Sequence, residues 1–379
     1  MNELPPLPSG VTCELVAPSD PELRTGWGLP LVRGAWFCPK SGSPRIAFIA
    51  AHYNLDFSQH YLGPILAQRG FGFLGWNTRY CGREAYFLFD RALVDLGLGV
   101  RWLRQRGTEV VVLLGNSGGG SLLAAYQAQT QAAVVRSAAG LSLAAGIDGL
   151  EPGDLYVSLA AHPGRAEVLT NWLDPSVTDE ADPTSTDPAL DMYDPGNGPP
   201  YSPEFAQRYR TGQRARNRRI TDWCKQELAR VQAAGSPDRL FTLQRTWADL
   251  RFLDPGLDPS DRPTPACYQG DPHKANRGIE GLGCLSTLRT WLAMWSLEDS
   301  QCHAGDCLKE IRLPSLVIQA RADAGVFPSD ARAIFDGLAA EDKRLVEVPG
   351  DHYFQHPSGS RNDVAELIAS WVGDRVDTP

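Results

Sequence analysis

The sequence has no excess of basic residues. Its 379 residues include 36 lysines and arginines against 45 aspartates and glutamates, which gives a formal net charge of −9. A nucleic-acid-binding protein usually presents a basic face, so we expect no nucleic-acid partner. The sequence also has no run of eighteen apolar residues, which argues against a membrane-spanning helix. Residues 1–10, MNELPPLPSG, lack the basic and apolar regions of a secretory signal. We therefore expect a cytoplasmic protein.

Cysteine is also sparse, with eight residues scattered over the chain. That number is too low for a disulfide scaffold in a protein of this length. The stretch CHAGDC, from Cys302 to Cys307, could suggest a metal, but there is no second closely spaced pair of ligands to complete a tetrahedral site. We expect no metal and no cofactor, and a small molecule as the partner, with a homo-oligomer as an open possibility.

Short apolar runs alternate with helical patterns in the first third of the chain. The runs 45–51, 71–76 and 110–115 have the length of buried strands. Apolar residues at helical spacing occupy 58–70 and 91–107. The alternation returns near the C-terminal end, with strands predicted at 154–162, 315–320 and 344–350 and helices at 329–340 and 361–372. Such a pattern predicts an α/β protein, with a mostly parallel central sheet flanked by helices.

Residues 163–310 have a different character. Prolines alternate with seven carboxylates between Asp174 and Asp194, so no regular helix or strand is expected there. A strongly basic, helix-compatible stretch follows at 208–235. The acidic stretch is either a solvated loop or a mobile lid segment that docks on the basic helix. We predict three parts: 1–162 and 311–379 form the core, and 163–310 is a mostly helical insertion between the sixth and seventh strands.

One serine lies among glycines where a predicted strand meets a predicted helix. Residues 115–119, Gly-Asn-Ser-Gly-Gly, match the pattern G-x-S-x-G, which places a nucleophilic serine on a sharp turn between strand and helix. The glycines permit a turn too tight for side chains, and we expect a strained backbone at Ser117. A glycine-rich phosphate loop would need a following Lys-Ser/Thr or a G-x-G-x-x-G spacing, and neither is present.

A serine hydroxyl needs a base to accept its proton, and the base needs a third group to orient it. Asp323 follows the predicted strand 315–320, and His352 follows the strand 344–350. The chain order Ser, Asp, His is the one expected for this topology. Asp330 and Asp351 are weaker candidates for the acid, because the first lies within a predicted helix and the second is adjacent to the histidine.

Together, GNSGGG, ARADAGVFP and PGDHYF resemble the motifs of the α/β-hydrolase superfamily. The resemblance covers 40–162 and 311–375, and the insertion lies where that superfamily carries its cap. It implies the α/β-hydrolase fold, with Ser117 as the nucleophile, His352 as the general base and acid, and Asp323 as its partner. The motifs are specific for the superfamily and for no substrate.

The oxyanion hole is where the sequence departs from many members of that superfamily. They carry His-Gly after the third strand, whereas this chain has His52-Tyr53-Asn54. One expected donor is the backbone N–H of Gly118, the residue after the nucleophile. The second could be the backbone N–H of Tyr53 or Asn54, or the Tyr53 phenol. A packed aromatic is an equal interpretation of Tyr53.

The predicted insertion is rich in tryptophan, at positions 172, 223, 247, 291 and 295. Trp291 and Trp295 are four residues apart, which is typical of a helix core and also suits an aromatic-lined pocket. We expect Trp291, Trp295, Asn116 and His52 to contact substrate. The favoured activity is cleavage of a carboxylic ester through an acyl-enzyme, on a bulky apolar or aromatic small molecule. An amidase, a lactonase, a hydrolase of carbon–carbon bonds, an acyltransferase and a non-catalytic ligand-binding protein are the alternatives.

Overall fold

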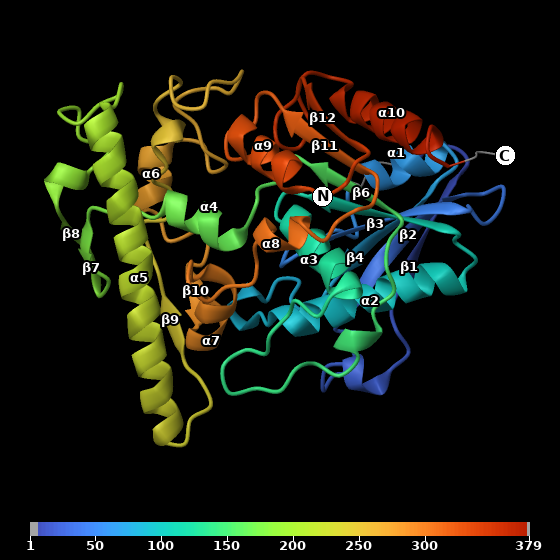
Figure 1. The fold of residues 1–379 in the computed structure, drawn as a ribbon, viewed down its shortest axis with the longest axis horizontal. Helices are drawn as coiled ribbons and strands as arrows, with labels where there is room; N and C mark the ends of the chain where they lie inside the picture. Colours follow the sequence, from blue (N-terminus) through green and yellow to red (C-terminus); the bar gives the residue numbers. More distant parts are fainter. Residues whose placement is uncertain (1–6, 377–379) are drawn as a thin grey trace.

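Eight strands form one sheet in the computed structural model, which describes residues 7–376 (Figure 1). Most of residues 1–10, from which a cytoplasmic location is expected, lie outside the described part. The strands lie in the order β1 (Val11–Val16), β2 (Arg33–Pro39), β4 (Gly72–Asn77), β3 (Ile46–His52), β5 (Val110–Asn116), β6 (Leu155–Leu159), β11 (Ser315–Ala320) and β12 (Lys343–Val348). Strand β2 is antiparallel to both of its neighbours, β1 and β4. The other neighbouring strands of the sheet, in the order β4, β3, β5, β6, β11 and β12, pair in parallel. The predicted mostly parallel sheet is confirmed.

Helices cover both faces of this sheet, which explains why its central strands are apolar on both sides. Helices α1 (Leu62–Gln68) and α10 (Ser360–Gly373) pack on one face. Helices α2 (Phe89–Gln105), α3 (Gly119–Gln131) and α9 (Pro328–Gly337) pack on the other. Within the part of the chain that the structure describes, no helix combines the length and apolar character needed to cross a membrane.

The chain between β6 and β11 lies at one end of the sheet, and we call residues 163–310 the cap (Figure 1). Its longest element is α5 (Pro203–Ala233), which lies far from the sheet at the left of Figure 1. The other cap elements are α4 (Arg165–Trp172), β7 (Val177–Asp179), β8 (Asp182–Thr186), β9 (Leu240–Thr242), α6 (Pro272–Arg277), β10 (Leu285–Thr287), α7 (Leu288–Thr290), a π-helical turn (Trp291–Trp295), α8 (Gly305–Leu308) and two short 3₁₀ helices (Pro188–Leu190 and Leu250–Phe252). Long irregular stretches separate these elements, notably the proline-rich residues 253–271, so helices make up less of the cap than expected.

The acidic stretch contains a β-hairpin of β7 and β8, so the expectation that it holds no strand is wrong. Short strands tolerate the proline at 183 because they form an isolated two-stranded sheet with free edges. The hairpin is tied to the basic helix α5, because Glu180 pairs with Arg216 at 2.7 Å and with Arg219 at 2.9 Å. Of the two interpretations of this stretch, docking on the basic helix is the one that the structure supports.

A buried ion pair anchors the start of the same stretch. The fully buried Asp174 carboxylate accepts hydrogen bonds from Arg245 and from the Asn276 amide, each at 2.8 Å. Replacing Asp174 with alanine leaves the largely buried Arg245 charge without its partner, so we expect a loss of about 3–5 kcal/mol in the free energy of unfolding. Urea denaturation measures this loss. The exposed Asp222 on α5 provides the control, because Asp222→Ala should change stability by less than about 0.5 kcal/mol. Equal effects of the two substitutions would contradict the anchoring role.

Candidate active site

Ser117 follows the last residue of β5 directly and has a backbone φ of 55°, a strained value for a residue other than glycine. The glycines around it are required by close packing. A Cβ added to Gly115 would lie 2.5 Å from the Gly120 Cα, and one added to Gly119 would lie 2.2 Å from the Ala51 carbonyl oxygen. The strained turn expected at this position is therefore confirmed.

Three side chains that lie far apart in the sequence meet at the carboxyl ends of β5, β11 and β12. The His352 Nε2 atom lies 3.1 Å from the Ser117 hydroxyl oxygen, and its Nδ1 atom lies 2.6 Å from Asp323 Oδ2. The competing carboxylates have other partners. Asp330 accepts the Phe327 N–H at the start of α9, and Asp351 accepts backbone N–H groups of its own loop. The structure thus brings together the serine, histidine and aspartate that the motifs single out.

The Asp323 carboxylate is fully buried and its second oxygen is saturated with donors. Oδ1 accepts hydrogen bonds from the backbone N–H groups of Gly325 and Val326, both at 2.9 Å, and from the Tyr268 hydroxyl at 2.8 Å. These contacts fix the plane of the carboxylate, so that Oδ2 is directed at the imidazole.

His52, the last residue of β3, lies beside the turn that carries Ser117. Its Nδ1 atom accepts the backbone N–H groups of Asn54 and Leu55, each at 3.3 Å, which favours the tautomer with the proton on Nε2. A Cβ added to Gly118 would lie only 2.7 Å from that Nε2 atom. Burial, together with the nearby Arg165 guanidinium, lowers the pKa of His52 well below its usual value. The ring is therefore neutral near pH 7 and offers its Nε2–H next to Gly118.

The candidate oxyanion donors at Tyr53 and Asn54 are resolved in part by this geometry. The Tyr53 phenol lies in the core, 3.0 Å from the Ser121 hydroxyl, and its ring packs against Phe87 with 5.3 Å between centroids. The prediction that the Tyr53 phenol is an oxyanion donor is therefore wrong, and this side chain is a packed aromatic. The Asn54 N–H donates to His52 Nδ1 and is therefore engaged within the protein. The remaining backbone candidates are the N–H groups of Gly118 and Tyr53.

A cavity of about 150 Å³ adjoins Ser117 and is closed on the cap side by Val168, Trp172, Trp247, Tyr268 and Leu282. Ligand pockets for drug-sized molecules usually exceed about 300 Å³, so this cavity is small. Its lining combines aromatic and aliphatic side chains with His52, His162 and Arg165.

Trp291 and Trp295 do not line this cavity, which corrects the expectation that they contact substrate there. Trp291 is fully buried, and its Nε1–H donates to the Thr221 hydroxyl at 3.0 Å. Trp295 is also fully buried and packs under the Arg165 guanidinium, 4.6 Å from it. The four-residue spacing correctly indicated that these two tryptophans are buried. They are buried against other cap residues and not against the cavity next to Ser117. The tryptophans that face the cavity are Trp172 and Trp247.

Asn116 lines the cavity, but its amide is engaged within the protein. Its Nδ2–H donates to the Leu159 carbonyl at 2.9 Å, and its Oδ1 lies 3.0 Å from His60 Nε2. Burial lowers the pKa of His60 to about 4, so its ring is neutral and donates to Asn116. This network holds the end of β5 in place and leaves Asn116 little capacity to bind substrate.

Several residues of the site were not predicted from the sequence. Arg165 is buried in an ion pair with Glu84 and lies over the Tyr53 ring, and burial lowers the pKa of His162 to about 3. His162 could have been found, because it ends the predicted strand 154–162 of the parallel sheet, at the edge where the other site residues gather. Tyr268 lies in the proline-rich stretch of the cap, which has no periodicity that could indicate its position.

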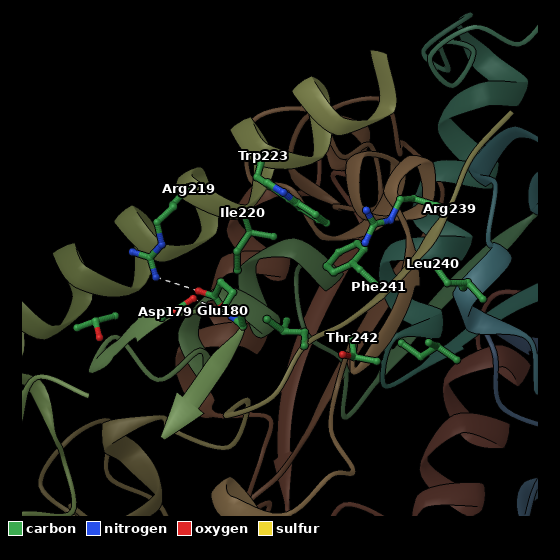
Figure 2. A pocket seen from close by; sticks show the side chains of 13 residues that line it. Asp179, Glu180, Arg219, Ile220, Trp223, Arg239, Leu240, Phe241 and Thr242 are labelled. Carbon is green, nitrogen blue, oxygen red and sulfur yellow. Dashed lines mark hydrogen bonds and ion pairs between the residues drawn. The ribbon is translucent and has the colours of Figure 1, made fainter. Parts of the chain in front are cut away.

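A larger cavity, of about 690 Å³, lies on the cap, away from Ser117 (Figure 2). Figure 2 shows Ile220 and Trp223 of α5 above it, with Asp179 and Glu180 of the β7–β8 hairpin on one side and the β9 residues Leu240, Phe241 and Thr242 on the other. The Glu180–Arg219 ion pair borders it. None of the residues expected to act in chemistry lines it, so cavity size alone does not identify the site.

No protein-family model matches the chain, and no curated protein sequence is significantly similar to it. Solved structures do match. The chain is similar to the α/β hydrolase GrgF from Penicillium sp. sh18, with 10% identity, a TM-score of 0.51 and coverage of 96% of this chain and 98% of that one. It is also similar to brefeldin A esterase, described as a bacterial homologue of human hormone sensitive lipase, with 13% identity, a TM-score of 0.50 and coverage of 99% and 80%. The strand order, the strand directions and these likenesses show that the chain has the α/β-hydrolase fold.

Proposed function

We propose that the protein is a serine hydrolase that cleaves a carboxylic ester through an acyl-enzyme, with Ser117, His352 and Asp323 as its catalytic triad. The chain of contacts from the Ser117 hydroxyl through His352 to the buried Asp323 carboxylate carries this proposal. A binding protein on this fold would need neither of these two contacts, which argues against a role in ligand binding alone. The esterase among the solved structures of the same fold is consistent with this activity.

In this mechanism the Ser117 oxygen attacks the ester carbonyl while His352 Nε2 accepts the hydroxyl proton. Asp323 holds the imidazole with Nδ1 protonated and stabilises the imidazolium that forms. The tetrahedral intermediate then expels the alcohol, which takes its proton from His352. A water molecule, activated by the same imidazole, hydrolyses the acyl-enzyme and regenerates the Ser117 hydroxyl.

The negative oxygen of the tetrahedral intermediate needs donors already in place. We assign the backbone N–H of Gly118 and the backbone N–H of Tyr53 to this role. The neutral His52 ring, whose Nε2–H lies beside Gly118, adds a third donor at the same place. This assignment gives His52 a contact with the reacting carbonyl, a narrower role than the substrate contact expected from the sequence.

The volume of the cavity bears on the size of the substrate. A bulky apolar or aromatic acyl group, as favoured from the sequence, does not fit into about 150 Å³ unless the cap residues move. We therefore propose a short acyl chain next to Ser117. Hydrolysis of p-nitrophenyl esters from acetate to decanoate tests this, with the matching anilides assayed alongside. We expect kcat/KM to be highest for the shortest esters and the anilides to react far more slowly. No turnover of any ester would contradict the proposed activity, whereas a maximum at decanoate would contradict only the size limit.

Leu282 offers a direct test of how the cap limits the acyl chain, because its side chain lines the cavity. Truncation in Leu282→Ala removes three carbons from the wall and should favour an ester with two or three more acyl carbons. We expect the ratio of kcat/KM for pentanoate over acetate to rise about tenfold, since a methylene in an apolar site is worth roughly 1–3 kcal/mol. The control is Leu285→Ala, on the larger cap cavity away from Ser117. An equal change of the ratio in both variants would contradict the assigned wall.

A further inference from the structure

Tyr268 is a cap residue whose hydroxyl reaches both of the groups that activate Ser117 in the proposed mechanism. Its oxygen lies 2.8 Å from Asp323 Oδ1 and 2.9 Å from His352 Nδ1. Tyr268 belongs to the irregular stretch before α6, 55 positions before Asp323 and 84 before His352. Through this contact the cap bonds to the acid and the base of the proposed triad.

The direction of each hydrogen bond follows from counting protons. Burial and the Asp323 carboxylate raise the pKa of the Tyr268 phenol well above its usual value, so the hydroxyl keeps its one proton. That proton is donated to Asp323 Oδ1, because an ionised carboxylate can only accept. The phenol oxygen can then only accept from His352 Nδ1. The proton on Nδ1 therefore has two acceptors, Asp323 Oδ2 at 2.6 Å and the Tyr268 oxygen at 2.9 Å.

This arrangement favours the imidazole tautomer that the proposed base requires. With the proton on Nδ1, the Nε2 lone pair is free to accept the Ser117 proton. The opposite tautomer would place an Nδ1 lone pair against two oxygens whose protons are absent or used elsewhere. The tyrosine ring also covers the imidazole, with 4.6 Å between the ring centroids and 37° between the planes.

The core is shaped to receive this ring. A Cβ added to Gly325 would lie 2.3 Å from the Tyr268 Cζ atom, so glycine at this position leaves the space that the phenol occupies. The ring also makes a T-shaped contact with Trp172 of α4, with 5.9 Å between centroids. Core and cap are thus both fitted to the position of Tyr268.

We propose that Tyr268 is a positioning residue, carried by the cap, that completes the hydrogen bonding of Asp323 and His352 and so couples seating of the cap to the reactivity of Ser117. This inference rests on the proposed serine-hydrolase function. Tyr268 acts only through hydrogen bonds, because its phenol proton is not transferred in any step.

The test compares Tyr268→Phe with Tyr201→Phe. Each substitution removes one hydroxyl and keeps the ring, so both variants should fold. The Tyr201 hydroxyl donates to the Met192 carbonyl at 2.8 Å, within a separate apolar cluster of the cap, so its loss removes a comparable hydrogen bond away from the site. Four quantities are measured for each protein: the rate of labelling by a fluorophosphonate, kcat and KM on a p-nitrophenyl ester, and the chemical shift of the downfield His352 Nδ1–H proton.

For Tyr268→Phe we expect labelling and kcat to fall about tenfold, because hydrogen bonds to charged groups are among the stronger ones in proteins. KM should stay within about twofold of the wild-type value, because the hydroxyl is assigned no contact with substrate. The Nδ1–H resonance should move in this variant and stay in place in Tyr201→Phe.

Labelling of Tyr268→Phe at the wild-type rate would overturn the inference. So would a fall in rate with an unchanged Nδ1–H resonance, or an equal fall in both variants, because each result would mean that the tyrosine only supports the cap. Failure of the proposed function is a separate result, since the wild-type protein itself would then resist labelling.

Discussion

Replacing Ser117 with alanine should lower kcat for ester hydrolysis on the order of 10⁶-fold, because the variant has no oxygen to form the acyl-enzyme. The residual rate over water should come from the oxyanion donors and substrate binding alone. The fold should be unaffected, because the substitution removes only the hydroxyl oxygen. The backbone N–H of residue 117, which donates to the Leu159 carbonyl at 3.0 Å, is kept. Steady-state kinetics on the best p-nitrophenyl ester measure the loss, and thermal denaturation checks the fold.

The exposed Ser329 at the start of α9 provides the matched control for this substitution. Ser329→Ala should keep the wild-type kcat, because the residue is outside the Ser117 cavity. Near-normal hydrolysis by purified Ser117→Ala would show that another group is the nucleophile.

Replacing Asp323 with asparagine should lower kcat roughly 10⁴-fold. The amide nitrogen of asparagine can donate to His352 Nδ1, which would stabilise the tautomer that cannot accept the Ser117 proton. The buried Oδ1 contacts with Gly325, Val326 and Tyr268 can be kept by the asparagine oxygen, so the fold and KM should change little. The measurement is kcat and KM over a range of substrate concentrations.

Two other carboxylates serve as controls for the acid. Asp330→Asn and Asp351→Asn remove carboxylates that bind backbone N–H groups of their own segments and do not bond to His352. Both variants should keep most of the wild-type kcat. A silent Asp323→Asn combined with a large loss in either control would mean that the acid has been assigned to the wrong residue.

The geometry around Ser117 could be predicted because it depends on topology. Parallel strands bring their carboxyl ends to one edge of the sheet, so residues that follow β5, β11 and β12 must lie near one another. Ser117, Asp323 and His352 each follow such a strand, and apolar runs of strand length are readily found in a sequence. The strand β1, at one edge of the sheet, and its neighbour β2 were not predicted. Strand β1 exposes most of its side chains, which hides the pattern of burial.

The lining of the site from the cap could not be predicted in the same way. Trp291 and Trp295 have the spacing of a buried helical face, and periodicity cannot distinguish burial against protein from burial against a ligand. Trp172 and Trp247 face the cavity because of how α4 and an irregular segment pack together, with 4.7 Å between the two rings. Tyr268 reaches Asp323 from a proline-rich stretch whose path depends on long-range contacts. Local sequence patterns do not encode such contacts.

Covalent mapping is the direct test of whether Ser117 is the nucleophile activated by His352. The wild-type protein is treated with a fluorophosphonate, digested, and analysed by mass spectrometry to locate the phosphonyl group. We expect one adduct per chain on the peptide that contains Ser117, and no adduct in Ser117→Ala or in protein denatured before treatment. An unmodified wild-type protein, or an adduct on any other residue with Ser117 free, would contradict this role of Ser117.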